Sequence, residues 1–248
     1  MQIGIDYGHC LKGYDTGAIG NGLKEQDITR EVGKIVTSKL RALGHKVIEC
    51  AIDSANSVNE SLSYRVNKAN SNNVDLFISI HVNAGGGQGT EIYTWDGEQL
   101  LEATRVLNNI TALGFNNRKI KNGSNLYVIR NTKAKAMLIE LFFIDSVDVE
   151  LYKKVGVEKI ANAIVEGITG KTVYNNSNNN WYSLDGKLGI VTATSGLNVR
   201  QSKSTNSKIL GVLTYGEKVR LFKKDGAWIS IYYPKHGGYV YADYIDIL

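Results

Sequence analysis

Cysteine and long apolar runs are both scarce in this sequence of 248 residues, and each shortage excludes a class of protein. The two cysteines, Cys10 and Cys50, are too few for a disulfide framework or a four-cysteine zinc cluster. We expect both thiols to be free and buried. No stretch approaches the ~20 consecutive apolar residues that a membrane-spanning helix needs, so the sequence predicts no membrane insertion.

Basic clusters and targeting signals are also missing from the sequence. The N-terminus lacks a basic stretch followed by an apolar one, which predicts synthesis in the bacterial host cytoplasm without a signal peptide. The formal net charge of +5 suits approach to an anionic polymer such as nucleic acid, a membrane face or a bacterial wall. Because no basic run or interleaved aromatic stripe accompanies this charge, we expect no nucleic-acid partner.

Residues 1–173 alternate between strand-like and helix-like segments. The runs predicted to be strands are QIGID, KVIECAI, VDLFISIHVNA, TEIYTW, LYVIR and AMLIELFFI. Amphipathic segments between them predict helices, including one at about 25–43, one at about 98–113 and a last one at about 148–169. This alternation predicts an α/β domain with a twisted, mostly parallel or mixed sheet and helices on both faces.

The character of the sequence changes after this domain. The polar, Asn-rich stretch TVYNNSNNNWYS predicts a linker at 174–186. Residues 187–248 then contain short strand-like runs without a helical pattern, separated by turn signals such as Asp225–Gly226. We therefore expect a second domain that is a small all-β barrel or sandwich.

Two of the four histidines, His9 and His81, come at the ends of apolar strands in the first domain. In a parallel sheet both side chains would emerge at the same edge, where open α/β sheets place their chemistry. Glu25 begins the helix that follows the first strand, so it enters from that same edge. Two imidazoles and one carboxylate form the His₂Glu set that leaves an open position on a catalytic zinc. His45 and His236 fall in predicted turns, and we expect them at the surface.

Glu140 interrupts MLIELFFI, among the most apolar stretches of the chain. A carboxylate buried there without a partner would be costly, and burial would raise its pKa toward neutrality. Such a group suits a general base. The alternative for Glu140 is a structural role in which it pairs with a Lys or Arg. The alternative for each histidine is a surface position in a turn. Taken together, the four polar groups favour a metal hydrolase.

Several motifs of the first domain occur together in a recognisable order: GIDYGHC, GYDTGAIGNGLKE, YRVNKANSNNVDLFISIHVNA and AMLIELFFIDSVDVELY. They resemble the zinc-dependent N-acetylmuramoyl-L-alanine amidases of the amidase-3 type over about residues 1–170. The resemblance implies that His9, Glu25 and His81 bind Zn²⁺. It also implies that Glu140 is the catalytic acid/base, which takes a proton from the attacking water and donates one to the leaving L-alanine amine.

The sequence departs from the family pattern at two places. Tyr7 and Cys10 flank the first histidine where the family often has Pro and Gly. Phe142, Phe143 and Asp145 follow the catalytic Glu where Gly-Phe and then Asn are usual. We expect the ligand set to be unaffected and the substrate contacts to be altered, with competition of Cys10 for zinc a minor alternative.

The C-terminal region resembles bacterial SH3-like domains, through GLNVRQSKSTNSKILGVLTYGEKVRLFKKDGAWISIYY and GGYVYADYI. Such modules commonly bind peptidoglycan, which makes residues 187–248 an expected cell-wall-binding domain. Its candidate contacts are aromatic, although most barrel aromatics belong to the core: Trp228, Tyr232, Tyr239 and Tyr241.

Together these resemblances imply a peptidoglycan hydrolase that cleaves the amide between N-acetylmuramic acid and L-alanine. A catalytic domain, a linker, a wall-binding module and no signal peptide look like a phage endolysin, which acts at the wall of a Gram-positive bacterium after release. A host autolysin, or a sporulation or germination amidase, is the biological alternative. A zinc peptidase that cuts within the stem peptide is the chemical alternative. A non-catalytic wall-binding protein is the alternative from another class.

Overall fold

The computed structural model describes residues 1–171, 181–234 and 237–248, in two compact units, Met1–Val173 and Tyr174–Leu248. Residues 174–180 of the expected linker, and His236, lie outside the described residues. Trp181–Ser183, also expected in the linker, instead form strand β11, which pairs with β15 of the second unit. Leu184 is buried in the core of that unit, so residues before 187 belong to the second unit.

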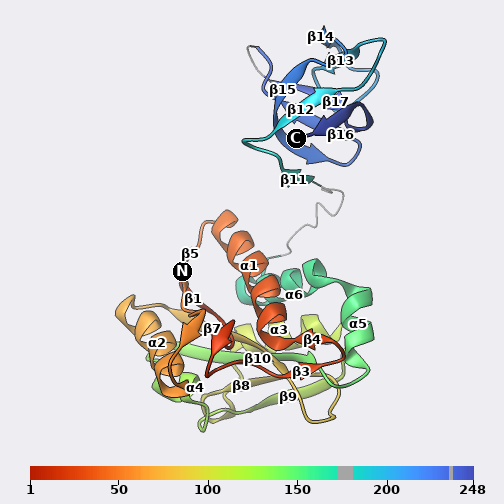
Figure 1. The fold of residues 1–248 in the computed structure, drawn as a ribbon. Helices are drawn as coiled ribbons and strands as arrows, with labels where there is room; N and C mark the ends of the chain where they lie inside the picture. Colours follow the sequence, from red (N-terminus) through yellow and green to blue (C-terminus); the bar gives the residue numbers. More distant parts are fainter. Residues whose placement is uncertain (172–180, 235–236) are drawn as a thin grey trace. The chain divides into compact units, whose positions relative to one another are not determined.

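A six-stranded mixed sheet forms the middle of the first unit, in the order β5-β1-β7-β10-β8-β9 (Figure 1). The first four strands of this order are parallel, β8 is antiparallel to β10, and β9 is parallel to β8. The sheet therefore confirms the predicted fold class. The strands are β1 Gln2–Tyr7, β5 Lys46–Glu49, β7 Leu76–Asn83, β8 Thr90–Thr94, β9 Asn117–Asn122 and β10 Lys135–Phe143. Two short pairs lie outside it: β2 Lys12–Gly13 with β6 Ser54–Ala55, and β3 Ile19–Gly20 with β4 Leu23–Lys24.

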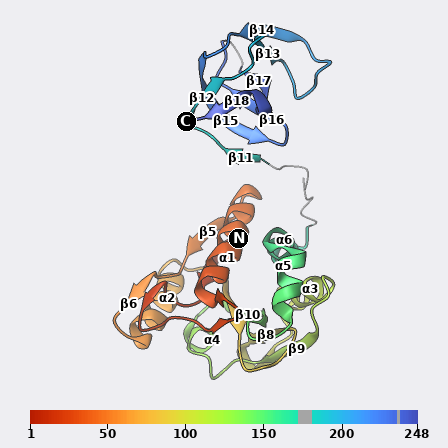
Figure 2. The same cartoon turned by 45° about the vertical axis from the view of Figure 1, so that its right-hand side comes forward.

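Helices cover both faces of this sheet, as predicted (Figures 1 and 2). The helices on one face share a core with Ile78 and Ile80 of β7: α1 Glu25–Ala42, α3 Leu101–Thr111, α5 Asp148–Val155 and α6 Val157–Thr169. On the other face, α2 Val58–Ser71 and α4 Tyr127–Asn131 share a core with Phe77 and Leu138. Because strand side chains alternate, a single apolar run such as β7 supplies both cores.

Helix α1 shows how tightly the first face is packed. Ile28, Val32, Val36 and Leu40 recur at helical spacing and are all buried. Gly33 lies on the same side, where a Cβ atom would fall 2.2 Å from Cδ1 of Tyr7. The close approach of α1 to β1 therefore requires glycine at this position.

Two predicted elements differ from the structure. LYVIR was expected to be a strand, but Tyr127–Asn131 form α4, and the neighbouring strand is instead the polar segment Asn117–Asn122. The helix buries Val128 and Ile129 against the sheet, whereas β9 is an edge strand that needs few apolar residues. The single helix expected at 148–169 divides into α5 and α6 at Gly156, whose φ of 82° is incompatible with a continuous helix.

The face covered by α2 and α4 becomes polar toward the carboxyl ends of the strands. Along β7 its side chains are Phe77, Ser79 and then His81, because every second residue faces the same way. Phe77 is fully buried, whereas the side chain of His81 is 17% exposed. The helices thus leave the end of this face open, and the candidate site lies there.

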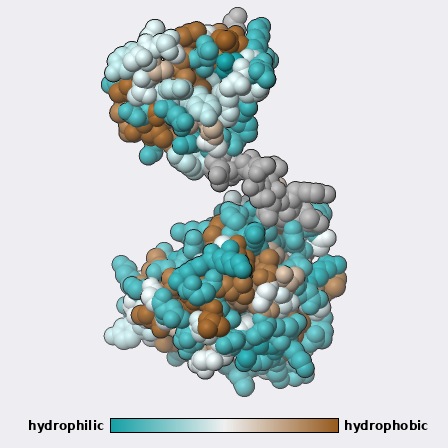
Figure 3. All heavy atoms as spheres, turned by 90° about the vertical axis from the view of Figure 1, so that its right-hand side faces the viewer, coloured by the Kyte–Doolittle hydropathy of each residue, from teal (hydrophilic) through white to brown (hydrophobic). Residues whose placement is uncertain are grey.

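The second unit is all-β, as predicted. Its main strand order is β14-β13-β17-β16-β15-β12-β18, and its core includes Val191, Val199, Leu221, Ile229 and Val240. The strands are β12 Leu188–Val191, β13 Leu197–Arg200, β14 Ile209–Leu213, β15 Lys218–Asp225, β16 Trp228–Ile231, β17 Gly238–Tyr241 and β18 Ile245–Ile247. Figure 3 shows hydrophobic areas among hydrophilic ones on the surface of both units. Within the described part of the chain, no helix has the length and apolarity needed to cross a membrane.

Candidate metal centre

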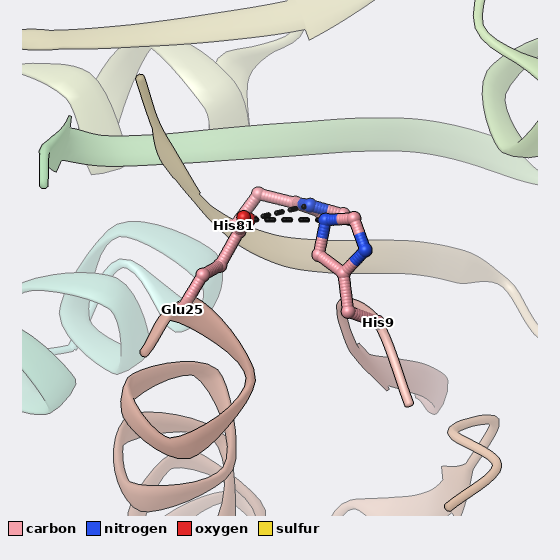
Figure 4. Close-up of side chains that lie close together, drawn as sticks. All are labelled: His9, Glu25 and His81. Atoms are coloured by element: carbon pink, nitrogen blue, oxygen red, sulfur yellow. Dashed lines mark hydrogen bonds and ion pairs between the residues drawn. The ribbon is translucent and has the colours of Figure 1, made fainter. Parts of the chain in front are cut away.

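Three side chains from three elements meet at the open end of the sheet: His9 just after β1, Glu25 at the start of α1, and His81 on β7 (Figure 4). Oε1 of Glu25 lies 3.3 Å from Nε2 of His9 and 3.1 Å from Nδ1 of His81. His9 has a φ of 67°, an uncommon conformation for a residue with a side chain, and such strain concentrates at functional sites. The sequence prediction that these residues share one edge agrees with this placement.

The donor set and its spacing fit a zinc ion. The candidate ligand atoms of these three residues all lie within 4.8 Å of one another. Tetrahedral zinc with bonds of about 2.0–2.1 Å separates neighbouring ligand atoms by about 3.3 Å. The two distances to Glu25 are close to this value, so the three side chains fit a zinc ion as ligands and leave one position open.

Glu25 is held in place by the backbone. Its Oε1 accepts a hydrogen bond from the N–H of Val82 at 3.0 Å, and its Oε2 accepts one from Ala18 at 2.9 Å. Strand β1 ends at Tyr7, so the carboxylate takes the place of the missing strand neighbour beside Val82. Burial raises the pKa of Glu25, but the hydrogen bonds with His81 and His9 outweigh it and hold the pKa well below its usual range. The residue is therefore an anion.

His9 is oriented from behind by a buried polar network. Its Nδ1 lies 2.9 Å from Oδ1 of Asp15, whose Oδ2 accepts a hydrogen bond from the hydroxyl of Ser61 at 2.5 Å. Arg65, fully buried on α2, lies 3.8 Å from Asp15 and forms a close ion pair with Asp6. Burial lowers the pKa of His9, yet the hydrogen bonds to Asp15 and Glu25 together raise it to about 10. Carboxylates commonly orient metal-binding histidines in this way.

Glu140 lies beside the three candidate ligands. It is paired in register with His81 across β10 and β7, so both side chains are on the same face. Its buried Oε2 has no hydrogen-bond partner among the described residues. Burial is the main reason that its pKa is raised to about 7, and the charges of Glu25 and Glu91 add to this effect while His81 opposes it. A carboxyl group of this kind can exchange a proton near neutral pH.

The sequence reasoning missed Glu91, which belongs to the same face as Glu140. It is the in-register partner of Glu140 on β8 and is only 2% exposed. Arg118 and Lys121 of β9 both form ion pairs with its Oε2 at 2.6 Å. Glu91 could have been found in the same way as Glu140, because it is the one charged residue in the predicted strand TEIYTW. Asp15 was also missed, because its partners are set by folding.

The departures from the family pattern lie around the site. Phe142 stacks between Phe115 and Tyr152 in the core, while Phe143 supports the guanidinium of Arg118 at 4.8 Å. Asp145 accepts hydrogen bonds from the N–H groups of Gly85 and Gly86 in the loop after β7.

The two cysteines are free and buried, as expected. The sulfur of Cys10 lies 3.5 Å from the hydroxyl of Ser61 and 3.9 Å from Nη2 of Arg65. Among the described residues, the candidate metal-binding group comprises His9, Glu25 and His81 without a cysteine.

The second unit has a groove of its own, with a volume of about 680 Å³. Trp228 and Tyr241, two of the predicted contacts, line it together with Tyr244 and Arg200. Tyr232 instead donates a hydrogen bond to Asp185 and lies under Arg220, and Tyr239 is not among the lining residues.

The fold and the site define a hydrolase-like α/β unit with a candidate metal centre, joined to a small β unit. A family model described as N-acetylmuramoyl-L-alanine amidase matches residues 3–170, and one described as bacterial SH3 domain matches residues 195–246. The first match covers most of the chain, and the chain belongs to the N-acetylmuramoyl-L-alanine amidase family.

Individual proteins agree with this assignment. The chain is 35% identical over 176 residues to the endolysin of Bacillus phage SPP1, covering 66% of this chain and 62% of that protein. It is 35% identical over 175 residues to the N-acetylmuramoyl-L-alanine amidase LytC of Bacillus subtilis, covering 66% of this chain and 34% of LytC. The solved catalytic domain of the CD27L endolysin, described as targeting Clostridia difficile, matches with a TM-score of 0.63 and 33% identity, covering 70% of this chain and 99% of that one.

Proposed function

We propose that the protein is a zinc-dependent peptidoglycan amidase that hydrolyses the amide between N-acetylmuramic acid and the L-alanine of the stem peptide. The juxtaposition of three candidate ligands with Glu140, whose buried Oε2 lacks a hydrogen-bond partner among the described residues, carries the proposal. Family membership supplies the class of reaction.

His9, Glu25 and His81 would hold Zn²⁺, with Asp15 fixing the ring of His9. The bound ion supplies Lewis acidity to carbonyl and water oxygens. The anionic Glu25 partly balances the charge of the ion, and the two imidazoles bind in their neutral form. Glu25 and His81 are anchored in α1 and β7, and His9, just after β1, is held by Asp15, so the three side chains give a rigid site.

Glu140 would move the protons. Its carboxylate accepts a proton from the attacking water as the water oxygen bonds to the lactyl carbonyl carbon. The carbon–nitrogen bond then breaks, and the protonated Glu140 returns the proton to the nitrogen of L-alanine. The products are a lactyl carboxylic acid and a free amine, and the carboxylate is restored. A pKa near 7 suits both halves of this cycle.

The second unit would hold the enzyme on its polymer. The aromatic and polar lining of its groove, including Trp228, Tyr241 and Arg200, supports a role in binding wall fragments. Attachment raises the effective concentration of the catalytic unit at the peptidoglycan. We propose that the protein acts at the wall of a Gram-positive bacterium as a phage endolysin, a role supported by its similarity to the SPP1 and CD27L endolysins.

Mass spectrometry of fragments released from Gram-positive peptidoglycan, with and without a zinc chelator, tests the proposed function. Free stem peptides that begin with L-alanine, released only without chelator, are the expected result. Peptides cut internally would assign the chain to the zinc peptidases. Wall binding and a bound zinc ion without any release would indicate a non-catalytic protein.

A further inference from the structure

A row of polar and charged side chains continues from the candidate metal centre across the sheet. His81 on β7, Glu140 on β10 and Glu91 on β8 are successive in-register partners, so their side chains share one face. The next strand, β9, adds Arg118 and Lys121, which both reach back to Glu91. The proposed mechanism uses the first two residues of this row and leaves the other end without a role.

The far end of the row carries a surplus of positive charge. Glu91 is buried, with side-chain exposure of 3%, and also accepts hydrogen bonds from Tyr93 at 2.7 Å and Asn83 at 3.0 Å. Arg118 and Lys121, its two cationic partners, are 36% and 37% exposed. One buried anion thus anchors two accessible cations, and the group has a net charge of +1.

Arg118 is positioned to bind an anion. Its Nε donates to Glu91, and its guanidinium lies 4.8 Å from the centre of the Phe143 ring. Among the described residues, its Nη groups have no hydrogen-bond acceptor, so this edge is available. Because Glu91 and the ring of Phe143 hold the guanidinium, its Nη donors are pre-oriented. A carboxylate can accept two parallel hydrogen bonds from such a pair of donors.

We propose that Arg118, assisted by Lys121, binds the free α-carboxylate of the D-glutamate at the second position of the stem peptide. This inference rests on the proposed amidase function. Two strand spacings, or about 10 Å, separate β7, which carries His81, from β8, which carries Glu91, the residue that Arg118 contacts. An extended peptide covers about 7 Å in two residues, and the hydrogen bond between its carboxylate and a guanidinium adds about 3 Å. The second stem residue is therefore within reach when the scissile amide lies at the metal centre.

The proposal distinguishes two wall chemistries, because the α-carboxylate of this glutamate is free in some walls and amidated in others. An amide has no negative charge to pair with Arg118, and it would place N–H donors against the guanidinium. The enzyme should therefore prefer walls with a free carboxylate. Phe143 contributes by supporting the guanidinium.

The test uses two substrates that differ only at this group: N-acetylmuramoyl-L-alanyl-D-glutamate and the corresponding D-isoglutamine compound. We expect the wild-type kcat/KM to be roughly tenfold or more higher for the carboxylate, since hydrogen bonds between charged groups are the strong ones. In Arg118→Gln the ratio should fall to near one. Arg118→Lys, which keeps the charge and loses the fork, should fall in between.

Lys119→Gln is the matched control, because it removes the same charge from an exposed neighbouring position of β9, and it should keep the wild-type ratio. Calorimetric binding of the two product dipeptides gives a readout that needs no turnover. It should show the same preference and the same loss in Arg118→Gln.

The outcomes separate the two claims. Equal wild-type kcat/KM for the two substrates, or a preference that persists in Arg118→Gln, would overturn the role of Arg118 while leaving the amidase in place. No hydrolysis of either substrate, together with no release of stem peptides from walls, would overturn the proposed function and this inference with it.

Discussion

Nδ1 of His9 lies 2.9 Å from Oδ1 of Asp15, a carboxylate that is itself fixed by Ser61 and faces Arg65. The pair fixes the ring so that its other nitrogen, Nε2, points at Glu25. Asp15 therefore acts on the metal centre without belonging to it.

Asp15→Asn should weaken zinc binding about 10- to 100-fold, because the ring loses a charged partner that fixes its orientation and basicity. Competition for zinc against a chromophoric chelator measures this directly. Asp27→Asn, an exposed acidic residue in the first turn of α1, is the control and should bind zinc like the wild type. Equal affinity in Asp15→Asn would show that the contact does not support the site.

The rate of hydrolysis should depend on the ionisation of Glu140. Its pKa is about 7 in the protein without metal, and a bound cation would lower it, so kcat/KM should fall as the pH drops through a value at or below 7. Because the carboxylate is the required base, the enzyme is active at pH values above the pKa of Glu140. Zinc content measured at each pH separates this limb from loss of metal, and a flat profile at constant zinc content from pH 4 to 8 would contradict it.

The ionisation of Glu140 should also affect folding stability in the protein without metal. Activity should rise with pH, whereas the free energy of unfolding should fall. Because the pKa of Glu140 is raised from 4.5 to about 7, the folded state binds more protons than the unfolded state between these values. Stability is therefore lost as the pH rises through this window, by about 3 kcal/mol at most. Glu140→Gln should remove this loss. Chemical unfolding of both proteins at pH 5 and pH 8 checks it, and identical pH dependence in the two would show that Glu140 is not responsible.

The contact between α1 and β1 gives a prediction independent of the metal. A Cβ atom at Gly33 would lie 2.2 Å from the ring of Tyr7, so Gly33→Ala should destabilise the protein by about 1–3 kcal/mol through overpacking. This outcome runs against helix propensity, which favours alanine by about 1 kcal/mol. Ser38→Ala, at an exposed position of the same helix, should change stability little. A stabilised Gly33→Ala in thermal unfolding would show that the helix can move away.

The sequence predicted the fold best where apolar residues form a recognisable pattern along the chain. Continuous apolar runs located β1, β7 and β10, and a parallel sheet brings their ends together, so His9, Glu25, His81 and Glu140 could be expected at one edge. Interactions between distant residues were harder to predict. Asp15 meets Ser61 and Glu91 meets Arg118 only because the strands and helices pack as they do.

Local sequence patterns gave wrong predictions where tertiary packing determines the secondary structure. LYVIR has strong strand propensity, yet Val128 and Ile129 are buried as part of a short helix that covers the sheet. The polar segment Asn117–Asn122 is a strand because it completes an edge beside β8. This unexpected strand supplies Arg118 and Lys121, and so the proposed carboxylate subsite could not be found from periodicity.

The most direct test of the central claim compares wild type with Glu140→Gln after both have been loaded with zinc. Zinc content and the release of L-alanine amino groups from peptidoglycan are measured on the same samples. We expect about one zinc per chain in both proteins, because Glu140 is not a proposed ligand. The rate of release should fall by about 10²- to 10⁴-fold in Glu140→Gln, which lacks the proton-transferring carboxylate. A zinc-loaded Glu140→Gln that releases stem peptides at the wild-type rate would contradict the account.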